Sequence, residues 1–156
     1  MENTTARNLW GDFLDQHLEY AFAQEPRVIC LSEDKLDTER QLDLILSGKK
    51  RAFSHSLLGM QYRNEKLPKI GDFTIITDNQ GVAKCLLRTV AVRLKPYFSI
   101  RESYAKIEGE GDLSLHYWKE MHWERITLEL EEYQRVPRES MIIVCEYFDK
   151  VFAPKK

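Results

Sequence analysis

Three observations predict that this chain folds as an α+β protein, in which helices surround a small β-barrel or strongly bent sheet. Apolar residues recur at helical spacing in several separate stretches, residues 73–94 alternate like a β-hairpin, and residues 141–148 form a nearly continuous apolar strand. The predicted order of elements is helix, helix, strands, helix, helix, strand. That order, with antiparallel pairing around the hairpin, is typical of the α+β class.

Two helices are predicted ahead of the sheet. Apolar side chains spaced three and four residues apart predict a helix over residues 6–23, which has to end before Pro26. Thr38, followed by Gln41 three residues later, forms a capping box, so a second and shorter helix is expected there. Gly48 is expected to end it, because glycine readily adopts the conformation found after helix C-termini.

The strand pattern begins at residues 73–77. Residues 78–81 supply turn-forming side chains, and residues 82–94 continue as a second strand with apolar and polar side chains on both faces. Mixed faces are expected where a sheet bends strongly or closes into a barrel. The last strand, residues 141–148, is apolar enough to lie in the middle of the sheet.

Two further helices are predicted between the hairpin and the last strand. Ser99 with Glu102 forms another capping box, and the short helix that it opens should stop at Gly109. Residues 113–133 show the longest helical pattern. Asp112 is most simply explained as the N-cap of that helix, where the helix dipole favours a carboxylate.

Composition limits the class of protein. The 156 residues carry a net charge of −2, are 43% hydrophobic and contain no repeat or linker. We therefore expect one domain over residues 1–156, with helix 6–23 packed on it as an extension. The longest apolar run has five residues, far below the roughly 20 that span a bilayer. No secretory signal opens the chain, so we expect it in the cytoplasm and away from membranes.

Metal binding finds little support in the sequence. The three cysteines have no CxxC spacing, and an odd number does not make a disulfide framework. His116 and His122 lie six residues apart, which is not the spacing of four that places two ligands on one helical face. We therefore expect neither a metal nor a cofactor.

The small net charge hides an uneven distribution. Residues 1–48 carry a net charge of −6, residues 49–101 a net charge of +8, and residues 102–156 a net charge of −4. The middle third is therefore a cationic segment between acidic ones. Whether these cations share one face of the folded protein is left open by the sequence.

The cationic segment opens with the strongest local motif, Lys49, Lys50 and Arg51 directly after a glycine, which we call the cationic loop. Three consecutive cations after a sharp turn can present donors to an anion such as phosphate. The spacing is not that of a Walker loop, and a solvated connector is the alternative. His55, between two serines, is the histidine that we single out as a candidate binding residue.

A second motif alternates carboxylates with glycines at residues 108–112, which we call the acidic loop. Such carboxylates can bind a metal, act as a general base or cap the following helix. Glu108 is the member that a helix end can aim into a cleft, whereas Glu110 is expected to be exposed. Tyr62 and Tyr117 are candidates for stacking on a base.

These motifs resemble the ASCH domain family, in its bacterial single-domain branch. The resemblance rests on Gly48-Lys49-Lys50, on Ser56-Leu57-Leu58, on Leu67-Pro68 before Gly71-Asp72-Phe73, and above all on the run from Glu108 to Trp118. It covers roughly residues 36–148. The resemblance implies a PUA-like fold, a small β-barrel with helices around it, and binding of RNA or a nucleotide-like ligand in a cleft between the two loops.

The resemblance also implies two hydrolytic activities, cleavage of single-stranded RNA and amide hydrolysis of N-acetylated cytidine. In the amidohydrolase motif GxKxxT, the lysine corresponds to Lys50 and the assisting glutamate to Glu108, but the threonine position is Phe53, which offers no nucleophile. Ser54 could replace it only through a shift of register. For the ribonuclease, Lys50 would stabilise the phosphate and Ser114 would donate a hydrogen bond.

Three hypotheses follow. In the first, the protein is a binding module whose cationic segment, residues 49–101, contacts the phosphates of RNA or of a nucleotide or nucleoside ligand, with Tyr62 or Tyr117 stacked on a base. In the second it is a hydrolase, and in the third an accessory protein with acidic faces. An ion pair between Lys50 and Glu108 could also be purely structural. We favour the binding module, because Phe53 removes a catalytic hydroxyl and leaves the cations in place.

Overall fold

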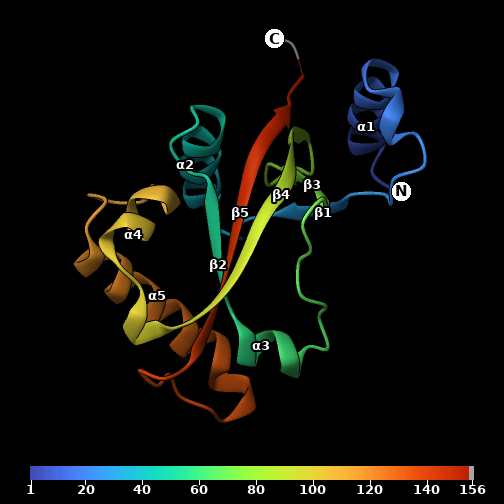
Figure 1. Ribbon diagram of the computed structural model, residues 1–156. Coiled ribbons are helices and arrows are strands. Elements are labelled where there is room, and N and C mark those ends of the chain that lie inside the picture. Colours follow the sequence, from blue (N-terminus) through green and yellow to red (C-terminus); the bar gives the residue numbers. More distant parts are fainter. Residues whose placement is uncertain (155–156) are drawn as a thin grey trace. The chain divides into compact units, whose positions relative to one another are not determined.

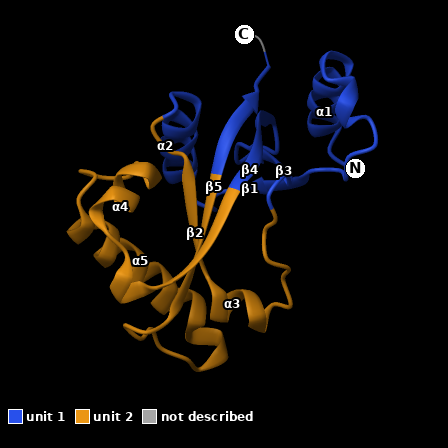
Figure 2. Ribbon diagram, viewed as in Figure 1, with its two compact units in different colours: residues 1–48, 70–90, 148–156 blue, residues 49–69, 91–147 orange. Residues whose placement is uncertain are grey.

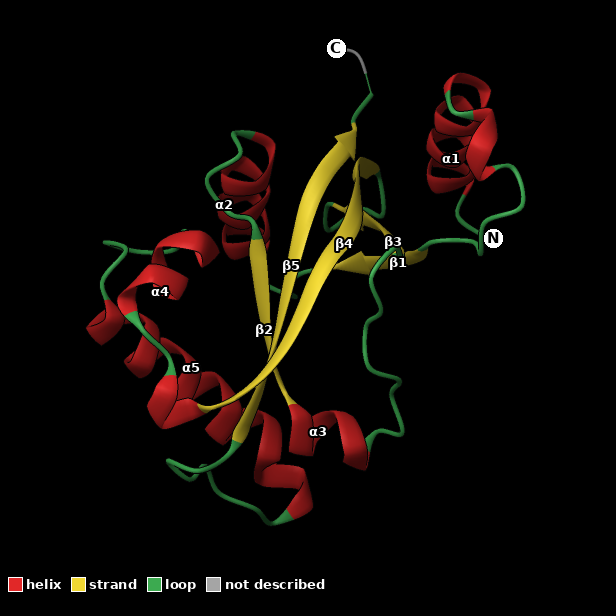
Figure 3. Cartoon of the chain, viewed as in Figure 1, coloured by secondary structure: helices red, strands yellow, loops and turns green. Residues whose placement is uncertain are grey.

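The computed structural model describes residues 1–154 and has the α+β composition expected from the sequence (Figure 3). Its five strands form hydrogen bonds in the order β1-β3-β4-β5-β2. The chain divides into two compact units, of which unit 1 comprises residues 1–48, 70–90 and 148–154 and unit 2 comprises residues 49–69 and 91–147 (Figure 2). Within residues 1–154, no helix is both long and apolar enough to cross a membrane.

Unit 1 contains the predicted hairpin. Strand β3 matches the expected residues, and β4, whose first part lies in this unit, pairs with it in antiparallel fashion, while β1 pairs with β3 in parallel. Helix α1 packs on these strands through an apolar core to which both contribute. The elements are α1 (Thr4–Gln16), η1 (Leu18–Tyr20), β1 (Arg27–Cys30), α2 (Lys35–Leu46), β3 (Phe73–Thr77) and β4 (Ala83–Pro96).

Two predictions for unit 1 were wrong in detail. The first helix does not run over residues 6–23, because the backbone leaves the helical region at His17, where φ is −140°. Asp34, not Thr38, is the N-cap of α2, and its side chain accepts from the Leu36 amide. Thr38 instead lies within the helix and donates its hydroxyl hydrogen bond to the Ser32 carbonyl. Gly48 does follow the end of α2, with φ of +80°.

Unit 2 contains helices that pack on the antiparallel pair β2 and β5 (Figure 1). The apolar core between them includes Trp118, Ile126 and Leu130 from α5 and Ile143 and Cys145 from β5. Strand β5 lies between β4 and β2, so the prediction of a central last strand is confirmed. The elements are β2 (Ala52–Ser56), α3 (Leu57–Tyr62), η2 (Tyr97–Ser99), α4 (Glu102–Glu108), α5 (Leu115–Leu130), η3 (Glu131–Tyr133) and β5 (Ile142–Phe152).

Both helix N-caps predicted for unit 2 were wrong, whereas Gly109 ends α4 as expected. Arg101 occupies the N-cap position of α4, and Ser99 instead donates its hydroxyl hydrogen bond to the Pro96 carbonyl. Ser114, not Asp112, is the N-cap of α5, and its Oγ accepts from the Tyr117 amide at 3.0 Å. A hydroxyl two residues further on therefore does what the carboxylate was expected to do.

Candidate functional site

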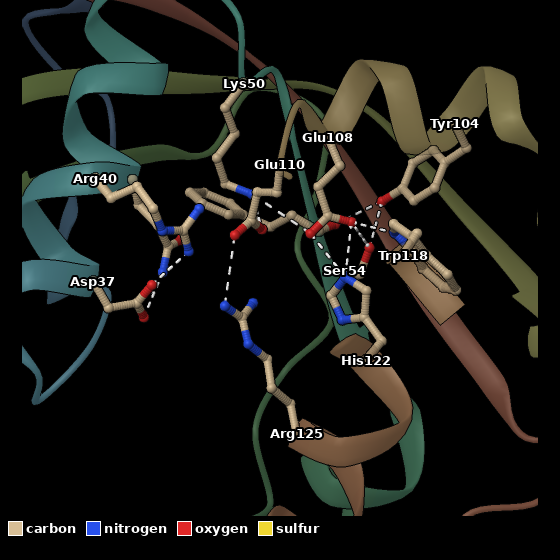
Figure 4. A network of polar contacts seen from close by, with 12 residues as sticks. Asp37, Arg40, Lys50, Ser54, Tyr104, Glu108, Glu110, Trp118, His122 and Arg125 are labelled. Carbon is tan, nitrogen blue, oxygen red and sulfur yellow. Dashed lines mark hydrogen bonds and ion pairs between the residues drawn. The ribbon is translucent and has the colours of Figure 1, made fainter. Parts of the chain in front are cut away.

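A buried lysine lies at the centre of the candidate site in unit 2. The Lys50 side chain is 1% exposed, and its Nζ lies 3.0 Å from Glu110 Oε2 and 3.5 Å from Glu108 Oε2 (Figure 4). Both carboxylates are buried as well. A lysine is almost never buried so completely unless its charge is paired, and here two carboxylates pair it.

Glu108 is the residue on which most of these contacts converge. Its Oε1 accepts from Trp118 Nε1 at 2.6 Å and from the Ser54 hydroxyl at 2.5 Å, and its Oε2 lies 2.9 Å from His122 Nε2. Burial opposes ionisation of Glu108, but the charges of His122 and Lys50 and the hydrogen bonds from His122 and Ser54 hold its pKa well below the usual range. Glu108 is therefore an ionised acceptor and a weak base.

The backbone brings the cationic loop and the acidic loop together. Gly109 ends α4 with φ of +78°, and a Cβ at this position would lie only 2.2 Å from the Lys49 carbonyl oxygen. The Arg51 amide donates to the Ile107 carbonyl at 2.9 Å. Only glycine combines this backbone conformation with so close an approach, so Gly109 allows the acidic loop to contact the backbone of the cationic loop.

Three basic side chains face the two carboxylates of the cluster. Lys50 and His122 contact Glu108, and Lys50 and Arg125 contact Glu110, with Arg125 Nη2 3.5 Å from Glu110 Oε1. Tyr104 adds a hydroxyl 2.9 Å from Ser54 Oγ, and burial together with the nearby Glu108 charge raises the pKa of this tyrosine, so that it stays neutral. Within residues 1–154, no group of three or more His, Cys, Asp or Glu side chains is arranged to hold a metal ion.

The structure brings together three of the predicted catalytic residues. Lys50, Glu108 and Ser54 share the buried cluster, whereas Ser114 caps α5 through its hydroxyl. Phe53 occupies the preceding position on β2, where it pairs with Glu146, while Ser54 pairs with Cys145. The Phe53 ring lies under the Lys50 ammonium, with its centroid 5.3 Å from Nζ, so Phe53 offers the cluster an aromatic face and Ser54 offers it a hydroxyl.

The predicted binding residues are distributed more widely. Lys49 and Arg51 are exposed on either side of the buried lysine. His55, 32% exposed, lies 2.9 Å from a carboxylate oxygen of Glu146. The two tyrosines lie in different surroundings. Tyr117 packs its ring against Gly111 of the acidic loop. Tyr62 stacks on Tyr133, with ring centroids 4.5 Å apart.

Sequence reasoning missed several members of the cluster. The expectation that Glu110 is exposed was wrong, because its partner Lys50 lies 60 residues away in the sequence. Trp118, His122 and Arg125 were placed on one side of the longest helix, and the presence of a histidine and an arginine on that otherwise apolar stripe was the signal for buried carboxylates.

Comparison with known proteins identifies the family. The ASCH domain model matches residues 28–152. The chain belongs to the ASCH domain family. A protein from Enterococcus faecalis V583 with a known crystal structure is 32% identical in sequence to this chain. The match covers 94% of this chain and 88% of that chain, with a TM-score of 0.84. The ASCH domain from Lactobacillus crispatus JV V101 is 26% identical, with a TM-score of 0.87 over 94% and 93% of the two chains. No curated protein matches the chain. The expected family and its PUA-like fold are thus confirmed.

Proposed function

We propose that this ASCH domain binds single-stranded RNA or a nucleotide, with Lys49 and Arg51 of the cationic loop contacting phosphate. The ASCH family is generally linked to RNA binding. The observation that carries the proposal is the buried cluster around Lys50, which holds a loop with two exposed cations against the end of α4. A loop that is ordered before binding loses less conformational entropy when it meets its ligand.

The ion pairs within the cluster support the same proposal. Glu108 and Glu110 would repel a phosphate if their charges were unpaired, but Lys50, His122 and Arg125 compensate these charges. The exposed charges of Lys49 and Arg51 are then left to attract a polyanion. In this arrangement Lys50 supports the loop, and its exposed neighbours make the contacts with the ligand.

Base contacts come from side chains near the acidic loop in the proposed complex. Tyr117 is half-buried and packs one part of its ring on Gly111, which fixes the ring in the manner required for stacking on a base. His55 is partly exposed and held by Glu146, so it can contribute a hydrogen bond. In the proposed complex these residues and the cationic loop together contact one or a few nucleotides.

A salt series tests the proposal. Binding of a fluorescently labelled single-stranded RNA is measured by anisotropy for the wild type and for the double variant Lys49→Ala/Arg51→Ala. Each lost phosphate contact on a single strand should reduce the slope of log K against log salt by about 0.7, so the double variant should lose about 1.4. The charge-matched control Lys66→Ala/Arg93→Ala removes two exposed cations from other segments and should keep the wild-type slope. A loop variant with wild-type affinity and slope would exclude the cationic loop.

Hydrolysis is the second candidate, and one observation favours it: the Ser54 hydroxyl donates to Glu108. Ser54 would be the nucleophile in place of the residue at position 53, acting on RNA or on an N-acylated nucleoside. The lowered pKa of Glu108 weakens it as a general base for this step. Single-stranded RNA and N-acetylcytidine should be incubated with the wild type and with Ser54→Ala. Turnover that disappears in the variant would establish this activity, and equal rates would exclude it.

A further inference from the structure

Unit 2 contains a pocket of about 440 Å³ that shares no lining residue with the Lys50 cluster. It is formed by α3, the turn after α5 and the start of β5. Its volume falls within the range of about 300–1,000 Å³ that is usual for small-molecule sites. No residue of the cationic loop or the acidic loop lines it.

The charges that line this pocket are all positive. Arg135 and Arg138 contribute guanidinium groups, and no aspartate or glutamate lines the pocket. Neither arginine forms an ion pair with a carboxylate in the part of the chain that the structure describes. These arginines belong to the segment that is acidic by residue count, so the positive character of the pocket arises from the fold.

One of the two guanidinium groups, that of Arg135, is held in place before any ligand arrives. Arg135 Nε donates to the Tyr62 hydroxyl at 2.8 Å, and Tyr62 is in turn stacked on Tyr133. Backbone hydrogen bonds from the Arg135 amide to Leu130 and from the Met141 amide to Arg138 close the turn at both ends. A guanidinium in a fixed orientation can accept a phosphate through two parallel hydrogen bonds.

The rest of the lining suits a flat, mostly apolar group with polar edges. Leu58, Val136 and Met141 provide apolar surface, while Gln61 and Gln134 provide amides that can both donate and accept. A nucleobase has flat faces for the apolar walls and hydrogen-bonding edges for the amides. One phosphate attached to one base therefore matches both the charge and the chemistry of the pocket.

We propose that this pocket binds a mononucleotide unit, its phosphate held by Arg135 and Arg138 and its base placed between the apolar walls. The inference rests on the proposed function for the class of ligand, and it assigns to that ligand a second site with residues of its own. Tyr62 acts there as a positioning residue, because its hydroxyl holds the Arg135 guanidinium.

Calorimetric titration with uridine monophosphate, uridine and inorganic phosphate tests the pocket. We expect the monophosphate to bind at least about tenfold more tightly than either uridine or phosphate alone, because charged hydrogen bonds and apolar contacts both contribute. Arg135→Gln/Arg138→Gln should weaken its binding by at least about tenfold, whereas Arg101→Gln, which removes an exposed arginine outside the pocket, should leave it unchanged.

A second variant keeps the test independent of the arginines. Ser140 is exposed and lines the pocket, so Ser140→Glu should repel the phosphate while Ser140→Gln, of similar size, should bind normally. Equal affinities for uridine and its monophosphate, or an unchanged affinity in the double arginine variant, would overturn the proposal. The titrations are repeated in the background Lys49→Ala/Arg51→Ala, which removes the cationic loop as a phosphate site; binding that remains there and is lost on adding Arg135→Gln/Arg138→Gln belongs to the pocket, so failure of the pocket and failure of the cationic loop give different results.

Discussion

Replacing Lys50 by methionine should destabilise the protein strongly. The substitution keeps a chain of similar length but removes the ammonium that lies 3.0 Å from Glu110 and 3.5 Å from Glu108. Glu108 keeps its hydrogen bonds from other residues, whereas Glu110 loses its 3.0 Å ion pair with Lys50 and keeps the longer one with Arg125 at 3.5 Å. Removal of one partner from a buried ion pair typically costs about 3–5 kcal/mol, and we expect a loss within that range.

The loss can be measured as the free energy of unfolding in urea, followed by circular dichroism. Since domains are stable by about 5–15 kcal/mol, a decrease of 3–5 kcal/mol is readily resolved. Lys49→Met is the matched control, because Lys49 is the preceding residue and its side chain is exposed. This substitution should change the free energy of unfolding by no more than about 0.5 kcal/mol. The double variant Lys50→Met/Glu110→Gln should recover part of the loss, since it removes the charge of the carboxylate that has lost its lysine. A decrease below about 1 kcal/mol for Lys50→Met would refute this account of the cluster.

Three further predictions concern the same unit. Because the folded-state pKa of Glu108 is lowered, its contribution to stability is complete above the unfolded value near 4.5 and is lost as the pH falls below it. Urea titrations between pH 7 and pH 3 should show this loss, and Glu108→Gln should flatten the profile. Ser114→Ala should lower the free energy of unfolding by about 0.5–2 kcal/mol, because α5 loses its N-cap, while RNA binding is kept. Loss of activity at unchanged stability would instead indicate a catalytic role. Gly109→Ala should destabilise by more than the roughly 1 kcal/mol of a typical substitution, because a Cβ would meet the Lys49 carbonyl; Gly11→Ala, with open space around it, is the control.

Local patterns were sufficient to predict part of the fold. Strand β3 and the turn after it follow from alternation and from turn residues that are adjacent in the sequence. Gly109 was correctly placed at the end of α4 for the same reason. Strand β2 was not predicted, because five residues with alternating polar side chains give a weak signal and β2 is stabilised by pairing with β5 about 90 residues later.

In the candidate site, too, local features were predicted and contacts between distant residues were not. The two loops were recognised from their charges and glycines, yet the burial of Lys50 and Glu110 depends on contacts between residues far apart in the chain. Helix caps were misassigned where several capping residues lie within a few positions, as at Asp112 and Ser114. The choice between them is made by the tertiary position of the helix start, which the local pattern does not contain.

The geometry on strand β2 bears directly on the choice between binding and hydrolysis. Ser54 donates its hydroxyl hydrogen bond to Glu108 and lies beside Tyr104, whereas Phe53 meets the cluster only with its ring, whose centroid lies 5.3 Å from Lys50 Nζ. The hydroxyl next to the glutamate is thus one residue later than the resemblance to the amidohydrolase motif requires. It also donates to a carboxylate whose pKa is held low by the charges of His122 and Lys50, and such a carboxylate accepts a hydrogen bond far more readily than a proton. The cluster is therefore better suited to holding two loops in a fixed, ion-paired arrangement than to activating a nucleophile, which leaves the exposed cations beside it as the groups that meet a ligand.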